Sequence, residues 1–125
     1  MAVDLNMPVL IVDDYKTMLR IIRNLLKQIG FNNVDEATDG KAALEKMQQR
    51  KYGLVISDWN MEPMNGQMLL QKIRADEQNK HLHFIMMTAD SAIDKIVQAK
   101  HLGVSGFINK PFNAEALRAK ISQIG

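Results

Sequence analysis

Five times along the chain, a short run of apolar residues is followed by a stretch in which apolar residues recur at helical spacing. The first run, 8–13, is apolar without alternation, which is typical of a strand buried on both faces. Similar runs follow at residues 34–37, 53–58, 84–88 and 106–109. Strict alternation of such strands with helices predicts a parallel sheet covered by helices on both faces, because parallel neighbours need a crossover connection. We therefore expect an α/β fold, with one domain over residues 7–125 and a short N-terminal tail at residues 1–6.

Several residues mark where the predicted elements begin and end. Asp14 is expected to cap the first helix and Asn113 the last one, because Asp and Asn side chains accept hydrogen bonds from the first turn. Gly30 is expected to end the first helix, and residues 91–94 resemble a capping box. The run at 34–37 is short and weakly apolar, which favours a place nearer the edge of the sheet.

Composition excludes several classes of protein. The chain has no cysteine, so disulfides, thiolate metal sites and cysteine nucleophiles are excluded. A net charge of +2, with basic residues scattered along the sequence, argues against nucleic-acid binding. No segment approaches the roughly 20 apolar residues of a membrane span, and the run at 7–12 is too short for a signal-peptide core. We expect a soluble, cytoplasmic protein that binds neither nucleic acid nor membrane.

Polar residues gather at the carboxyl ends of the predicted strands, which is where ligands bind in parallel sheets. They are Asp13 and Asp14 after the first strand, Asp58 after the third, Thr88 after the fourth and Lys110 after the fifth. Three carboxylates on one rim are suited to Mg²⁺, which prefers oxygen ligands. An Asp can also act as a nucleophile toward phosphorus, with Lys110 supplying positive charge and the Thr88 hydroxyl a hydrogen bond.

Each of these residues also has an ordinary structural explanation. Asp after a strand often caps a helix or a turn, Thr at a strand end is often structural, and Lys before Pro is often solvated. His81, His83 and His101 lack the arrangement of metal ligands and are expected either at the surface or with their hydrogen bonds satisfied within the fold. The case for a functional site rests on the joint occurrence of the polar residues at four strand ends.

Four stretches carry a resemblance to a known family: residues 10–14, 57–61, 87–89 and 110–112. With them, the chain resembles the receiver domain of bacterial two-component response regulators, and among these the single-domain, CheY-like chemotaxis regulators. The resemblance implies a flavodoxin-like sheet with strand order 2-1-3-4-5. It also implies that Asp58 accepts a phosphoryl group from a CheA-like histidine kinase, and that the Lys110–Pro111 bond is cis.

The resemblance assigns further roles residue by residue. Mg²⁺ would be held by Asp14, Asp58 and the backbone carbonyl of Asn60, with Asp13 acting through water. Thr88 and Lys110 would contact the phosphoryl group, and Thr88 and Phe107 would then switch conformation. Asn60, Ala89 and Asp90 would tune the lifetime of the phosphoryl group. Two features depart from the family pattern: Phe107 stands where the chemotaxis regulators have Tyr, and Pro63 comes one place late in its loop.

The implied output is a change in protein binding rather than an enzymatic turnover, apart from Mg²⁺-dependent self-phosphorylation and autodephosphorylation at Asp58. The chain ends after the fifth helix, so we expect no output domain. Some receivers pair through the fourth helix, fifth strand and fifth helix, but a monomer is the expected state. Its phosphorylated form would bind a flagellar motor switch protein through the fourth helix, fifth strand and fifth helix. Basic side chains expected on that face are Lys95, Lys100, Arg118 and Lys120.

Three other functions are considered. A phosphate sink or a relay shuttle to a phosphotransfer protein would use the same site. A phosphatase of the haloacid-dehalogenase type wants a second Asp two residues after the nucleophile, where this chain has Asn60. A flavodoxin-like flavin binder wants Ser, Thr and Gly after its first strand, where this chain has Asp-Asp-Tyr-Lys at 13–16.

Overall fold

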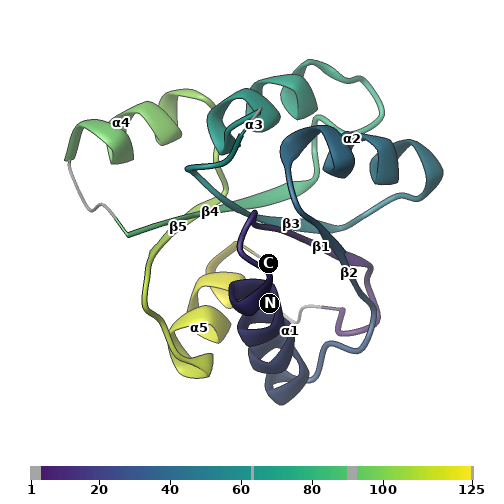
Figure 1. Ribbon diagram of the computed structural model, residues 1–125, viewed down its shortest axis with the longest axis vertical. Helices are drawn as coiled ribbons and strands as arrows, with labels where there is room; N and C mark the ends of the chain where they lie inside the picture. Colours follow the sequence, from purple (N-terminus) through teal and green to yellow (C-terminus); the bar gives the residue numbers. More distant parts are fainter. Residues whose placement is uncertain (1–3, 63, 90–92, 125) are drawn as a thin grey trace.

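The computed structural model describes residues 4–62, 64–89 and 93–124, without the side chains of residues 93–95 and 99. Within these residues, five strands and five helices alternate along the chain (Figure 1). The strands are β1 (Val9–Val12), β2 (Val34–Ala37), β3 (Leu54–Asp58), β4 (His83–Thr88) and β5 (Gly106–Asn109). The helices are α1 (Lys16–Ile29), α2 (Gly40–Gln49), α3 (Gly66–Ala75), α4 (Ile93–His101) and α5 (Ala114–Ile124).

The strands form a parallel five-stranded sheet in the order β2-β1-β3-β4-β5. This confirms the predicted fold class, the strand order implied by the resemblance and the edge position of the run at 34–37. Figure 1 shows α1 and α5 on one face of the sheet and α2, α3 and α4 on the other. The Lys110–Pro111 peptide bond is cis, as the resemblance implied.

The sheet separates two hydrophobic cores. Along β1, Leu10 and Val12 belong to the core beneath α2 and α3, whereas Val9 and Ile11 belong to the core beneath α1 and α5. Successive side chains of a strand point to opposite faces, so a sheet covered on both sides needs apolar residues at every position. All four residues of β1 are fully buried, which explains why its sequence shows no alternation.

Most element boundaries agree with prediction to within one residue. Gly30 ends α1 in a left-handed conformation with φ of 119°, and its N–H donates to the carbonyls of Leu26 and Lys27. The side chain of Asn113 accepts a hydrogen bond of 2.8 Å from the Ala116 N–H, which confirms the predicted cap of α5. The predicted capping box at 91–94 and Pro63 fall outside what the structure describes.

The predicted cap at Asp14 is wrong. Tyr15 occupies the N-cap position of α1, and no side chain caps this helix. The chain turns through Asp13 instead, because its Oδ1 accepts a hydrogen bond of 2.9 Å from the Tyr15 N–H. The helix therefore begins one residue later than predicted, and Asp14 remains exposed on the rim of the sheet.

His81, His83 and His101 are all exposed, which is one of the two settings expected for them. None of the described helices is long and apolar enough to cross a membrane.

Candidate functional site

The carboxyl ends of β1 and β3 bring three carboxylates together. Val12 pairs with Ser57 across these neighbouring strands, so the residues that follow, Asp13 and Asp58, lie side by side. One oxygen from each of Asp13, Asp14 and Asp58 lies within 4.8 Å of the other two. Residues 45 positions apart in the sequence thus meet because parallel strands end on the same rim.

Lys110 joins this cluster from the end of β5. Its Nζ lies 3.1 Å from Oδ2 of Asp13 and 3.2 Å from Oδ1 of Asp58. The structure thereby brings together four of the residues that the sequence singled out at strand ends. Three carboxylates against one ammonium leave this group of side chains short of positive charge.

Burial sharpens this imbalance. Asp13 is 1% exposed and Asp58 is 7% exposed, whereas Asp14 faces solvent. Burial raises the pKa of the Asp58 carboxyl above its usual value, the Lys110 ammonium lowers it, and the neighbouring Asp13 charge raises it again. Desolvation and a like charge both disfavour the ionised form of Asp58. An added positive charge would therefore stabilise the ionised carboxylates of this site.

Thr88 lies at the end of β4, beside the carboxylates. Asp58 pairs with Met87 across β3 and β4, and Thr88 is the next residue. Its side chain is fully buried, and its backbone carbonyl accepts a hydrogen bond of 2.7 Å from the Lys110 N–H. Thr88 thus holds the residue whose ammonium reaches the carboxylates.

Phe107 of β5 contacts the residue that follows Asp58. The rings of Trp59 and Phe107 meet edge to face, with centroids 6.5 Å apart and planes at 64°. Trp59 is buried and Phe107 is half-buried. A direct side-chain contact therefore connects the loop after β3 with the fifth strand.

The residues expected to tune phosphoryl lifetime lie at the rim. Asn60 and Ala89 are exposed, just beyond Asp58 and Thr88 respectively. Asp90 falls outside the described part of the chain.

Gly66 is a site residue that the polar residues at the strand ends do not indicate. A Cβ at this position would lie 2.3 Å from the Asp58 carbonyl oxygen and 2.8 Å from Sδ of Met86. Its N–H donates a 2.9 Å hydrogen bond to the Trp59 carbonyl. The absence of a side chain lets α3 begin directly against the backbone of Asp58. The sequence does contain a hint of this role. Glycine has a low helix propensity, so a glycine at the start of a helix suggests that a side chain would not fit there.

The chain belongs to the response regulator receiver domain family, whose pattern it matches over residues 9–122. It is 48% identical over 119 residues to the chemotaxis protein CheY-3 of Vibrio cholerae, covering 95% of this chain and 92% of that protein. It is 47% identical over 118 residues to the chemotaxis protein CheY of Pseudomonas aeruginosa, covering 94% and 95%.

The fold is also similar to a solved structure of the chemotaxis response regulator CheY4 of Vibrio cholerae. The TM-score is 0.88 at 31% identity, and the match covers 96% of this chain and 99% of that one. The relatives compared are thus chemotaxis response regulators, in agreement with the resemblance drawn from the four sequence stretches.

Proposed function

We propose that this protein is a phosphorylation-activated chemotaxis regulator that accepts a phosphoryl group on Asp58 in the cytoplasm. The observation that carries the proposal is the setting of Asp58: a nearly buried carboxylate at a strand end, 3.2 Å from the Lys110 ammonium and grouped with two further carboxylates. An Asp that served only as a cap or turn residue would not need two acidic neighbours and a partly buried cation.

The acidic cluster fits Mg²⁺. Its members offer carboxylate oxygens within 4.8 Å of one another, and such oxygens are the ligands this ion prefers. Asp14, Asp58 and the backbone carbonyl of Asn60 would hold the ion, with Asp13 acting through water. When bound, Mg²⁺ supplies positive charge that offsets the charge on the phosphoryl oxygens.

In the proposed transfer, a carboxylate oxygen of Asp58 attacks the phosphorus of a phosphohistidine on a CheA-like kinase. The new O–P bond forms as the P–N bond breaks, and the imidazole leaves and takes up a proton. Lys110 holds positive charge beside the transferred group, and the Thr88 hydroxyl donates a hydrogen bond to it. Hydrolysis of the acyl phosphate resets the site, so the protein signals and does not turn over a substrate of its own.

The proposed output uses the contact between Trp59 and Phe107. Because Phe107 touches the residue next to Asp58, a change at the phosphoacceptor reaches β5 through one side-chain contact. Thr88 and Phe107 would switch together and alter the face formed by α4, β5 and α5. Lys100 and Arg118 are exposed there, and Lys120 is partly exposed. A flagellar motor switch protein is the proposed partner.

The chain carries its own probe for the first test. Trp59 is the only tryptophan and adjoins Asp58, so its fluorescence is measured while Mg²⁺ and then acetyl phosphate are added. We expect one change with Mg²⁺ and a second, reversible change with acetyl phosphate. Asp14→Ala should weaken the first change, and Asp58→Asn should abolish the second. Glu45→Gln, which removes an exposed acid from α2, serves as the matched control. Unchanged fluorescence and unchanged protein mass would refute the proposal.

A second measurement tests the output. Phosphorylated and unphosphorylated forms are compared for binding to a motor switch protein and to a phosphotransfer protein. We expect phosphorylation to tighten binding to the switch protein by roughly tenfold. Equal binding of both forms, together with phosphoryl transfer to the phosphotransfer protein, would instead identify a phosphate sink or relay shuttle.

A further inference from the structure

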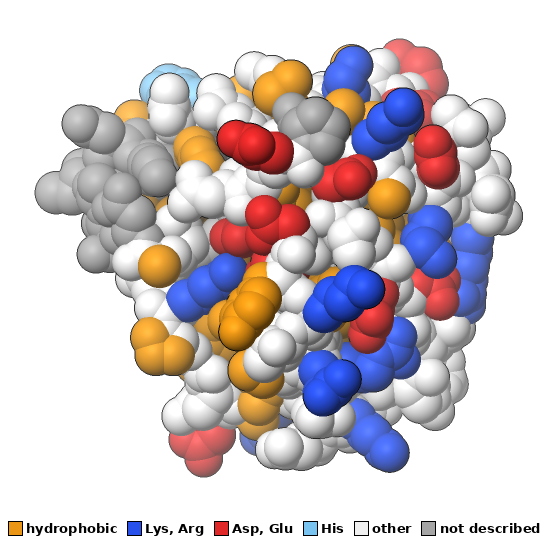
Figure 2. Space-filling model, in the orientation of Figure 1, with side chains coloured by type: hydrophobic (Ala, Val, Ile, Leu, Met, Phe, Trp, Pro, Cys, Tyr) orange, Lys and Arg blue, Asp and Glu red, His pale blue; other side chains and the backbone are white. Residues whose placement is uncertain are grey.

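Helix α1 carries a stripe of basic residues on the side next to the sheet edge. Lys16, Arg20, Arg23 and Lys27 follow one another at intervals of four, three and four residues, so they share one face of the helix. All four are exposed. In the sequence the basic residues look scattered, and folding gathers these four into one basic stripe. Figure 2 shows Lys and Arg side chains gathered over α1 and the adjoining edge of the sheet.

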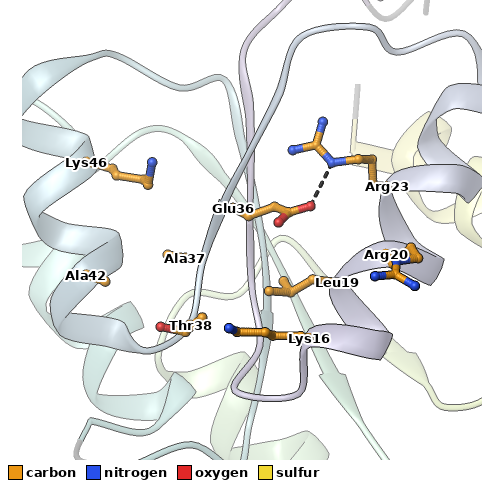
Figure 3. Close-up of a pocket in the computed structure, with 9 residues that line it drawn as sticks. All are labelled: Lys16, Leu19, Arg20, Arg23, Glu36, Ala37, Thr38, Ala42 and Lys46. Carbon is orange, nitrogen blue, oxygen red and sulfur yellow. Dashed lines mark hydrogen bonds and ion pairs between the residues drawn. The ribbon is translucent and has the colours of Figure 1, made fainter.

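The basic stripe borders a groove along the outer edge of β2. A cavity of about 590 Å³ lies between α1 and α2 beside β2, with Lys16, Arg20 and Arg23 on one side and Lys46 on the other (Figure 3). A second cavity of about 280 Å³ continues past Arg23 to Lys27. Among the described residues that line the two cavities, five carry positive charge and Glu36 alone is acidic. Glu36 is already paired, since its Oε2 lies 2.7 Å from Nε of Arg23.

The backbone of β2 is available in this groove. The strand lies at the edge of the sheet, and β1 is its neighbour in the sheet. Val9 N donates to the Asn33 carbonyl and Asp13 N to the Ala37 carbonyl, so odd-numbered residues of this segment turn their backbone toward β1. Because parallel strands alternate, the N–H and C=O groups of Val34 and Glu36 face outward, in position to pair with an added strand.

The charges decide what such a strand must be. A second copy of this chain that paired through its own β2 would bring a second basic stripe against the first, and the like charges would repel. Five positive charges against one carboxylate, which is itself paired, also exceed what is needed to keep an edge strand from aggregating, for which isolated charges suffice. An extended acidic segment would match both the outward-facing backbone of β2 and the positive charge of the groove. Its backbone can pair with β2 while its carboxylates face the basic stripe.

We propose that the groove between α1 and β2 is a docking site for an extended acidic segment of a partner protein, which adds a strand to the edge of the sheet. The site lies apart from the α4, β5 and α5 face and does not depend on the phosphorylation of Asp58. The Asp58→Asn variant is therefore expected to bind the acidic segment as the natural protein does, which separates this proposal from the proposed function.

The test uses a fluorescein-labelled peptide of alternating Glu and Val, about ten residues long, and follows its anisotropy. We expect saturable binding that weakens with added salt, and no binding of the matching Lys-Val peptide. Arg20→Glu with Lys27→Glu should weaken binding by roughly tenfold or more, because both changes place like charge in the groove. Glu36→Gln should tighten binding by about two- to threefold, since it removes the acid and frees Arg23.

The control variant is Lys51→Glu with Lys72→Glu, which changes net charge equally at two exposed positions that do not line the groove. Thermal unfolding of each variant verifies that it is folded. Equal weakening by both double variants would overturn the proposal, because only overall charge would then matter. Unchanged binding of a peptide N-methylated along one edge would overturn strand addition. Tighter binding of a DNA duplex, or dimerisation without peptide, would assign the groove to a different occupant.

Discussion

The surroundings of Asp58 disfavour its ionised form. It is 7% exposed, and burial and the charge of Asp13 both favour its protonated form. Lys110 offsets part of this cost, yet it must serve Asp13 as well. The residue is therefore destabilised relative to an exposed Asp, in the way expected of groups that serve chemistry rather than folding.

The pH dependence of stability follows from the raised pKa. The folded state binds the Asp58 proton more tightly than the unfolded state, so stability from this group is lost as pH rises from 3.8 through the folded pKa. Asp58→Asn should consequently stabilise the protein at neutral pH by about 1 kcal/mol, with a smaller effect near pH ~4. Urea unfolding across this range measures both values, with Glu45→Gln as the exposed control. A stability gain that does not vary with pH would contradict the argument.

The identities of the site residues were predictable, but their environments were not. Asp13, Asp14, Asp58 and Lys110 follow runs that end on one rim, so the topology alone predicts their meeting. The sequence does not distinguish the buried Asp13 from the exposed Asp14, because that difference depends on where α1 begins. It also does not reveal that Gly66 touches the Asp58 backbone, which depends on how closely α3 approaches β3.

At the scale of elements, Arg74 connects α3 to two loops. Its Nε donates to the Gly103 carbonyl at 3.0 Å, and Nη1 donates to the carbonyls of Lys80 and Leu82 at 3.0 and 2.7 Å. Its Nη2 lies 3.5 Å from the hydroxyl oxygen of Ser105. One side chain thus holds the segments that lead into β4 and β5, and burial lowers its pKa. Nothing in the sequence marks this role, since Arg74 reads as an ordinary basic residue in the last turn of a helix.

Replacing Arg74 by Met keeps the aliphatic stem and removes the donors. We expect a loss of about 2–3 kcal/mol in unfolding free energy, because three backbone carbonyls lose a charged partner. Hydrogen exchange should become faster around residues 103–105 and 80–82. Lys72→Met, an exposed change on the same helix, should leave both quantities nearly unchanged. Exchange that accelerates evenly over the whole chain would argue against a local connection.

The helix ends show where local rules hold and where they fail. Asn113 and Gly30 act as predicted because their hydrogen bonds are to residues only three or four positions away in the sequence. Asp14 does not, because the preceding Asp13 accepts the Tyr15 N–H and shifts the start of α1. Of the two adjacent carboxylates, Asp13 therefore shapes the turn before α1.

On the scale of the whole molecule, one sheet is shared by two cores. Ile22 of α1 and Leu70 of α3 are fully buried on opposite faces. Truncating either to Ala should cost about 2–5 kcal/mol. Both variants should still unfold in one transition, because the strands contribute to both cores. Ile21→Ala is the matched control, since Ile21 is 44% exposed and should cost far less. Two separate transitions in calorimetry would show that the faces fold independently.

The type of sheet could be predicted from the sequence pattern, but the order of its strands could not. Apolar runs without alternation predicted a parallel sheet with both faces covered, and the structure confirms it. The strand order came from the family resemblance, because periodicity does not specify which strands are neighbours. The spacing of Lys16, Arg20, Arg23 and Lys27 already places the basic stripe on one face of α1, whereas the groove beside it depends on where β2 and α2 lie.

The order of the elements along the chain bears on how the protein is made. The apolar side of α1, which includes Leu19, Ile22 and Leu26, emerges early in synthesis. Its cover includes Leu117 and Ile121 of α5, the last element in the order. One core therefore cannot close until α5 has left the ribosome. Throughout elongation, α1 presents an apolar surface that chaperones can recognise and other nascent chains can bind.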